Sequence, residues 1–167
     1  GNKIGAVLLL WQGGMESGNA AADLLCGNIN PCGKLSDTVM RNYNDCPSAT
    51  NYGNKEFNNY EEDIYVGYRW FETFNKDGVL YPFGYGLSYT EFETSLKKAE
   101  ATATGFEFTV SIKNTGALPG KEAVQIYLQK PCAVLGNPAR ELAAFGKTAL
   151  LQPGEEQEIC LTVDLYS

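Results

Sequence analysis

The sequence predicts an α+β chain in which a short strand-helix portion with long loops precedes an antiparallel β-sandwich. Three observations support this class. A continuous apolar run followed by a helical pattern stands near the beginning, and the second half changes to apolar residues that alternate with polar ones. Turn residues, and no helical patterns, separate these alternating runs.

Residues 4–11 form a continuous apolar run that ends at Gln-Gly-Gly, a pattern typical of a strand buried on both faces. Residues 19–26 carry apolar pairs at a spacing of four, and Gly27 stands where a helix usually ends, so a helix is predicted there. A single strand and helix cannot bury both faces of the strand. We therefore expect this region to belong to a larger sheet that is missing or contributed by another chain.

Residues 28–59 are rich in Asn, Pro, Gly and Ser, which predicts a long irregular connection with at most a short strand at 35–40. Residues 60–89 are unusually aromatic. A helix is predicted at 66–74 because Val66, Trp70 and Phe74 recur at a spacing of four. Asp77-Gly78 predicts a turn after it.

Alternation with a period of two predicts strands at 106–112 and 159–163, and a further apolar run predicts one at 123–128. Such strands, joined by turns, are typical of an immunoglobulin-like or fibronectin III-like sandwich. About five strands can be counted where seven are usual. We expect the sandwich to be incomplete, with the last one or two strands beyond Ser167.

Composition narrows the possible functions. The net charge is -7, and the charged residues form no block of like sign, which argues against nucleic acid and anionic membrane partners. The longest apolar run is far too short to span a bilayer. Histidine is absent, so chemistry would need carboxylates, tyrosine or lysine. Five cysteines without a CxxC pair predict free thiols and no metal site, which weakly favours a reducing, cytoplasmic compartment. No cofactor is expected.

Three ordered segments carry a family resemblance. Residues 13–35 are similar to a long signature of family-3 glycoside hydrolases, and residues 65–71 with 80–90 resemble that family's YVGYRYF and PFGYGLSYT stretches. Residues 110–154 resemble its fibronectin-like domain. The resemblance implies that residues 1–89 are the C-terminal part of the α/β sandwich domain with an aromatic linker. It implies that residues 90–167 are a truncated fibronectin-type-III-like domain. The sequences of residues 43–52 and 63–74 resemble those of family members whose domain order is permuted.

The resemblance also implies a chemistry: retaining, exo-acting hydrolysis of a β-glucoside or β-xyloside by a nucleophile and an acid/base carboxylate. The family's aspartate nucleophile lies in a barrel domain and its glutamate lies earlier in the sandwich domain, and neither maps onto this sequence. No catalytic residue is therefore assigned. The chain alone is expected to be inactive and to give structural support to the parent enzyme. Its expected partners are the missing barrel and sandwich domains and, through the parent enzyme, a β-linked oligosaccharide or glycoside. The alternatives are a non-enzymatic carbohydrate-binding or adhesion module and a structural spacer.

Two further sites have a functional and a structural interpretation. Glu16 follows the predicted strand, where ligands bind in open sheets, so it is the one candidate for substrate binding; its alternative role is to cap the following helix. The aromatic residues at 60–89 could stack on sugar rings or pack between the two domains. Arg69 is expected to pair with Glu61, Glu62 or Asp63, with a substrate contact as its alternative.

Overall fold

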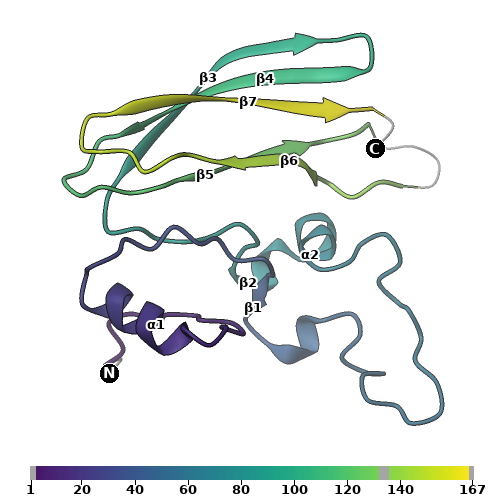
Figure 1. The fold of residues 1–167 in the computed structure, drawn as a ribbon. Coiled ribbons are helices and arrows are strands. Elements are labelled where there is room, and N and C mark those ends of the chain that lie inside the picture. The colour runs from purple at the N-terminus through teal and green to yellow at the C-terminus, as the bar shows by residue number, and fades with distance from the viewer. Residues whose placement is uncertain (1–2, 132–135, 166–167) are drawn as a thin grey trace.

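The computed structural model describes residues 3–131 and 136–165, which form two halves, one above the other (Figure 1). The lower half contains the long loops and the helices, and the upper half contains the longer strands. The elements of the lower half are α1 (Ser17–Leu25), β1 (Val39–Met40), η1 (Tyr43–Asp45), α2 (Tyr68–Phe74), η2 (Lys76–Gly78) and β2 (Val79–Tyr81). Those of the upper half are β3 (Phe92–Ala101), β4 (Gly105–Asn114), β5 (Ala123–Leu128), β6 (Glu141–Lys147) and β7 (Glu156–Asp164).

The upper half is the predicted antiparallel sandwich. One sheet has the order β3-β4-β7, and a second sheet pairs β5 with β6. Apolar residues that alternate along the strands meet between the sheets and form the core. Its buried members are Val110, Ile112, Val124, Leu151 and Leu161.

The count of about five strands is confirmed, because β3 to β7 are the strands of the upper half among the described residues. The sequence patterns located β4, β5 and β7 but neither β3 nor β6. Nearly all of β3 is exposed, and its pairing with β4 shifts register between Leu96 and Lys98. Strand β3 lies at a sheet edge and carries several charged side chains. Because it has no buried face, its sequence lacks the alternation of apolar and polar residues by which a strand is recognised.

The lower half contains both predicted helices. Helix α1 begins two residues earlier than expected, at Ser17, and is followed by Gly27 as predicted. Helix α2 begins at Tyr68, two residues later than expected, because Gly67 precedes it with a φ of 61° and so lies outside the helical region. The short strand expected at 35–40 is limited to Val39–Met40, which pairs with β2.

The strand predicted at residues 4–11 is wrong for this chain. The segment is irregular, and its large apolar side chains are exposed, with Ile4 78% and Val7 72% accessible. A strand needs backbone partners on at least one side, and no described strand lies beside this segment.

Four cysteines among the described residues, Cys26, Cys32, Cys46 and Cys160, are free thiols, as predicted; Cys132 lies outside the described residues. In the part of the chain that the structure describes, no helix is long and apolar enough to cross a membrane.

Candidate functional site

Glu16 lies at the N-terminal end of α1, fully on the surface. Its carboxylate accepts a hydrogen bond from the side-chain amide of Asn19, at 2.5 Å, and makes none to the backbone N–H groups of the helix. The expected side-chain cap is therefore not formed. Among the described residues, Asn19 is the hydrogen-bond partner of the Glu16 side chain, and the binding of substrate by Glu16 stays a prediction.

The three segments that carry the family resemblance meet at the junction of the two halves. The ammonium group of Lys34 donates to the carbonyl oxygen of Gly86 at 3.0 Å and pairs with Glu122 at 2.7 Å. Both side chains of the ion pair are less than one fifth exposed. Nearby, Leu35 exchanges backbone hydrogen bonds with residues 84 and 85. These contacts join residues 13–35, residues 80–90 and the segment before β5.

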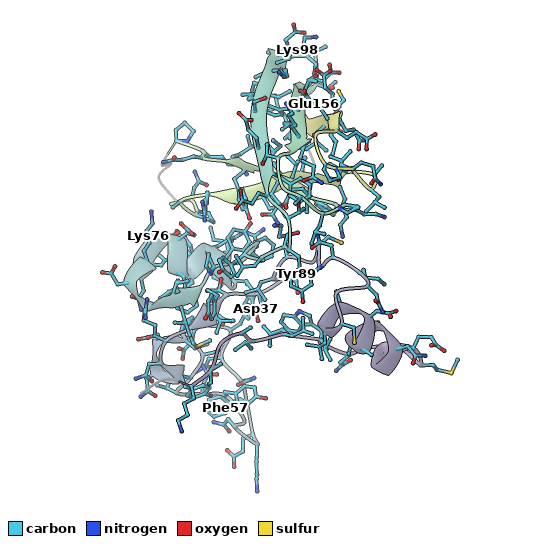
Figure 2. All side chains as sticks on the ribbon, turned by 90° about the vertical axis from the view of Figure 1, so that its left-hand side faces the viewer. Asp37, Phe57, Lys76, Tyr89, Lys98 and Glu156 are labelled. Carbon is cyan, nitrogen blue, oxygen red and sulfur yellow. The ribbon has the colours of Figure 1, made fainter. Side chains whose placement is uncertain are left out.

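Asn30 makes a second connection across this junction. Its amide donates to the carbonyl of Pro119 at 3.1 Å, while its side-chain oxygen accepts from the Ser88 hydroxyl and the Tyr89 backbone N–H, each at 2.8 Å. Figure 2 shows Tyr89 between the sandwich and the lower half. One side chain thus uses its donor and acceptor groups to hold two segments against the sandwich.

A buried pair continues the network inside the sandwich. The Thr90 hydroxyl donates to the side-chain oxygen of Asn114 at 2.9 Å, and the amide of Asn114 donates to the carbonyls of Leu118 and Leu151. Asn114 is fully buried, so these bonds satisfy groups that would otherwise be costly to bury.

Aromatic packing forms the other side of the junction. Tyr68, only 9% exposed, stacks on Phe83 with ring centroids 4.6 Å apart and meets Tyr127 of β5 edge-on at 6.1 Å. Its hydroxyl oxygen accepts the backbone N–H of Leu142 in β6 at 2.7 Å. For these rings the packing interpretation holds. Other aromatic side chains of this stretch, including Tyr60 and Tyr85, stay exposed.

Arg69 does not pair with the expected carboxylates. Its Nε lies 3.4 Å from Glu141 of β6, and Glu72 of the same helix pairs with Arg140. The prediction failed because it sought a partner close in sequence, whereas α2 packs against the start of β6. The partners therefore reach across the junction.

Tyr127 of β5 lies at this junction beside the guanidinium group of Arg140. Burial raises the pKa of the Tyr127 phenol, and the Arg140 guanidinium, centred 4.9 Å from the ring, opposes that rise. The neutral phenol donates a hydrogen bond to Gln125 at 2.9 Å. This arrangement stabilises a neutral structural side chain.

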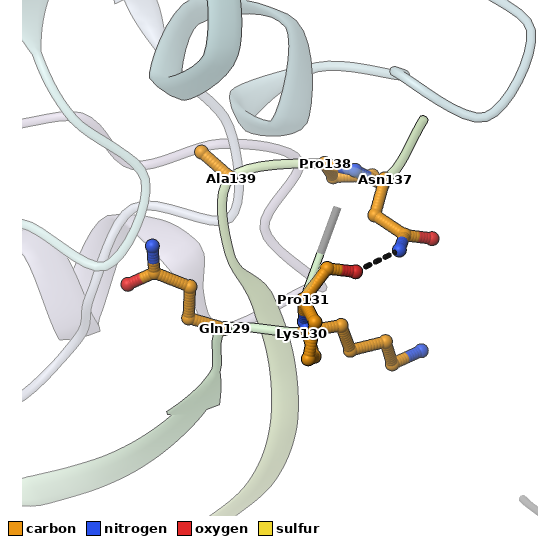
Figure 3. A pocket seen from close by; sticks show the side chains of 6 residues that line it. All are labelled: Gln129, Lys130, Pro131, Asn137, Pro138 and Ala139. Atoms are coloured by element: carbon orange, nitrogen blue, oxygen red, sulfur yellow. Dashed lines mark hydrogen bonds between the residues drawn. The ribbon is translucent and has the colours of Figure 1, made fainter. Parts of the chain in front are cut away.

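Two of the hollows on the described surface are close to the junction or to the ends of β5 and β6. One has a volume of about 480 Å³ and lies between the end of β5 and the start of β6, where Asn137 donates to the Pro131 carbonyl (Figure 3). The other, of about 330 Å³, lies between residues 32–34 and the paired strands β5 and β6. No carboxylate lines either hollow among the residues described there. Retaining hydrolysis requires two carboxyl groups about 5 Å apart, so neither hollow has the groups for it.

No group of three or more His, Cys, Asp or Glu side chains in the described ranges could hold a metal ion. Among the described residues, the polar contacts of Asn30, Lys34 and Glu122 are gathered at the junction between the two halves. The sequence predicts no role for Asn30, Lys34 or Glu122. Their position inside the three family-like segments is the signal that could have identified them.

The fold and the junction define a class of protein, one in which an α/β portion is fastened to a fibronectin III-like sandwich. The model of the glycosyl hydrolase family 3 C-terminal domain matches residues 1–89, and the fibronectin type III-like domain model matches residues 122–167. The chain belongs to glycosyl hydrolase family 3.

Proteins that are similar to this chain support the same family assignment. A β-glucosidase of Ruminococcus albus is 49% identical over 95% of this chain, and β-glucosidase A of Butyrivibrio fibrisolvens is 45% identical over 99% of it. The solved β-glucosidase of Paenibacillus barengoltzii covers 89% of the chain with a TM-score of 0.86 and 50% identity. This chain spans only 17% of the first relative, 22% of the second and 17% of the solved structure.

Proposed function

We propose that this chain is part of a retaining, exo-acting β-glycosidase that hydrolyses a β-glucoside or β-xyloside, and that it supplies structural support without catalytic residues. The observation that carries the proposal is the junction. The three segments shared with the family fasten the two halves together through Lys34, Glu122 and Asn30, and supply no carboxylate pair to either hollow.

In this proposal, the two halves of the chain belong to different domains of the parent enzyme. Residues 1–89 act as the C-terminal part of an α/β sandwich domain, and residues 90–167 act as the fibronectin III-like domain. The partners are the barrel domain and the remaining sandwich domain of the parent enzyme, which hold the nucleophile and the acid/base. Glu16 is a substrate contact only where these domains bring a glycoside to the exposed start of α1.

The purified chain is expected to show no hydrolysis of an aryl β-glucoside, because the bond needs an attacking carboxylate and a separate proton donor. Release of the aryl group, followed by absorbance, measures this. Activity that survives further purification and is abolished by changing one of the chain's own carboxylates would contradict the proposal. Titration with cellobiose or xylobiose tests the alternative, since saturable binding by the chain alone would favour a carbohydrate-binding module.

A further inference from the structure

Helix α2 and the sandwich present the same three kinds of side chain to each other, because each side supplies one tyrosine, one arginine and one glutamate. The members are Tyr68, Arg69 and Glu72 of α2, and Tyr127, Arg140 and Glu141 of the sandwich. On each side the guanidinium group lies over the tyrosine ring of that side, at 5.2 Å from the ring centroid of Tyr68 and 4.9 Å from that of Tyr127. The two rings meet edge-on, so the two sets of side chains face each other across the junction.

The charges of the two sets pair crosswise. The Nε atom of Arg69 lies 3.4 Å from the carboxylate of Glu141, and the guanidinium group of Arg140 donates to the carboxylate of Glu72. Each arginine thus pairs with the glutamate of the opposite half. If α2 lay in the reverse direction, Arg69 would face Arg140 and Glu72 would face Glu141. Like charges brought together in this way disfavour the wrong arrangement.

Two lysines provide an internal comparison. Lys76 lies 3.9 Å from Glu72 and Lys130 lies 2.9 Å from Glu141, so each of these ion pairs stays within one half. The lysine side chains are 70% and 56% exposed, and such pairs contribute little to stability. They also form whether or not the two halves are in contact. The crosswise arginine pairs form only when α2 is docked on the sandwich.

We propose that Tyr127, Arg140 and Glu141 form a docking surface that selects the helix it binds by the order of the charges on that helix. The partner that fits is a helix with a tyrosine and an arginine side by side and a glutamate one turn later, as α2 has in Tyr68, Arg69 and Glu72. The packed rings hold the helix, and the crosswise charges determine its direction. The inference concerns docking and does not depend on the reaction of the parent enzyme.

The backbone amide of Leu142 reports docking directly, because its N–H group donates to the Tyr68 hydroxyl. Hydrogen exchange followed by NMR measures how often this bond opens. Arg69→Glu and Glu141→Arg should each speed exchange of the Leu142 amide by about fivefold or more, because each places like charges opposite each other.

The double variant Arg69→Glu/Glu141→Arg restores opposite charges across the junction. Its Leu142 amide should therefore exchange more slowly than in either single variant, within about twofold of the unchanged chain. Lys130→Met is the control, since it removes an ion pair of Glu141 that lies within one half. It should change the exchange rate by less than about twofold.

Two further readings separate docking from the stability of the sandwich. The amides of β4 should exchange alike in all four variants and the unchanged chain. Added salt should speed exchange at Leu142 in the unchanged chain but not in β4, because it screens partly exposed ion pairs. This second reading needs no variant to fold.

Three results would overturn the proposal. The first is a double variant whose Leu142 amide exchanges as fast as in the faster single variant. The second is an effect of Lys130→Met as large as that of Arg69→Glu. The third is equal acceleration in β4 and at Leu142, with variants or with salt, because the whole fold and not the docking of α2 would then be lost.

Discussion

At the scale of single residues, Tyr68 joins the two halves by packing and by a hydrogen bond. Its ring stacks on Phe83 while its hydroxyl accepts the Leu142 N–H of β6. Tyr68→Phe keeps the ring and leaves that N–H without its partner, so it should lower the free energy of unfolding by about 1–2 kcal/mol. Urea denaturation measures the change.

Tyr52→Phe is the matched control for this change, because Tyr52 is 77% exposed and has no described hydrogen bond from its hydroxyl. It should change the free energy of unfolding by less than about 0.5 kcal/mol. Equal effects of the two substitutions would contradict the role given to the Tyr68 hydroxyl.

Tyr127 makes the stability of the junction depend on alkaline pH. Burial raises the pKa of its phenol above the ordinary value of 10.0, so the folded chain holds this proton more tightly than the unfolded chain does. The resulting stability is fully present below the unfolded pKa and is lost as pH rises through the folded pKa.

Denaturation midpoints measured from pH 8 upward should therefore fall less steeply above pH 10 in Tyr127→Phe than in the unchanged chain. Exposed Tyr43 provides the control, and Tyr43→Phe should follow the unchanged chain. Identical profiles for all three proteins would show that Tyr127 titrates normally.

At the scale of elements, the loop after β2 packs closely against β5. Gly84 has a φ of 80°, and a Cβ atom placed there would lie 2.2 Å from the side-chain oxygen of Gln125. Gly53 has the same φ of 80° with open space around it. The two glycines thus share the backbone requirement and differ in their surroundings.

Gly84→Ala and Gly53→Ala should both destabilise the chain by about 1 kcal/mol through backbone strain. Gly84→Ala should cost more, because Gln125 must also move away from the junction. Thermal unfolding of the two variants measures the difference. A larger effect at Gly53 would show that the loop after β2 does not pack on β5 in solution.

The elements that the sequence predicted well are those whose pattern is local. Strand β5 occupies the predicted residues, and α1 and α2 lie within two residues of their predicted starts, because apolar spacing and turn residues determine them. Strand β3 and the ion pair of Arg69 were not predicted. The first has no buried face, and the second depends on packing between elements far apart in sequence.

The candidate site was also predicted only in part, because its contacts join segments that are far apart in sequence. Sequence located the segments that contain Asn30 and Lys34, but only the fold shows that these segments meet beside Glu122. Glu16 was selected from its place after a predicted strand that this chain does not form on its own. Its partner is Asn19, and its role in binding stays a proposal.

At the scale of the whole molecule, the two halves differ in how they bury their apolar residues. The sandwich encloses a core around Ile112, whereas the lower half leaves Ile4, Trp11 and Leu25 largely exposed. The relatives are several times longer than this chain, which spans 17–22% of the first two. This contrast supports the proposal that further domains of a family-3 enzyme cover the lower half.

The most direct test of this account is the sequence of the gene on both sides of the segment that encodes residues 1–167. The account predicts one continuous reading frame that also encodes a barrel domain with an aspartate nucleophile, and the position of that domain would decide between ordinary and permuted domain order. Stop codons close to both ends, with no further domain between them, would contradict the enzyme proposal and favour a binding or structural module.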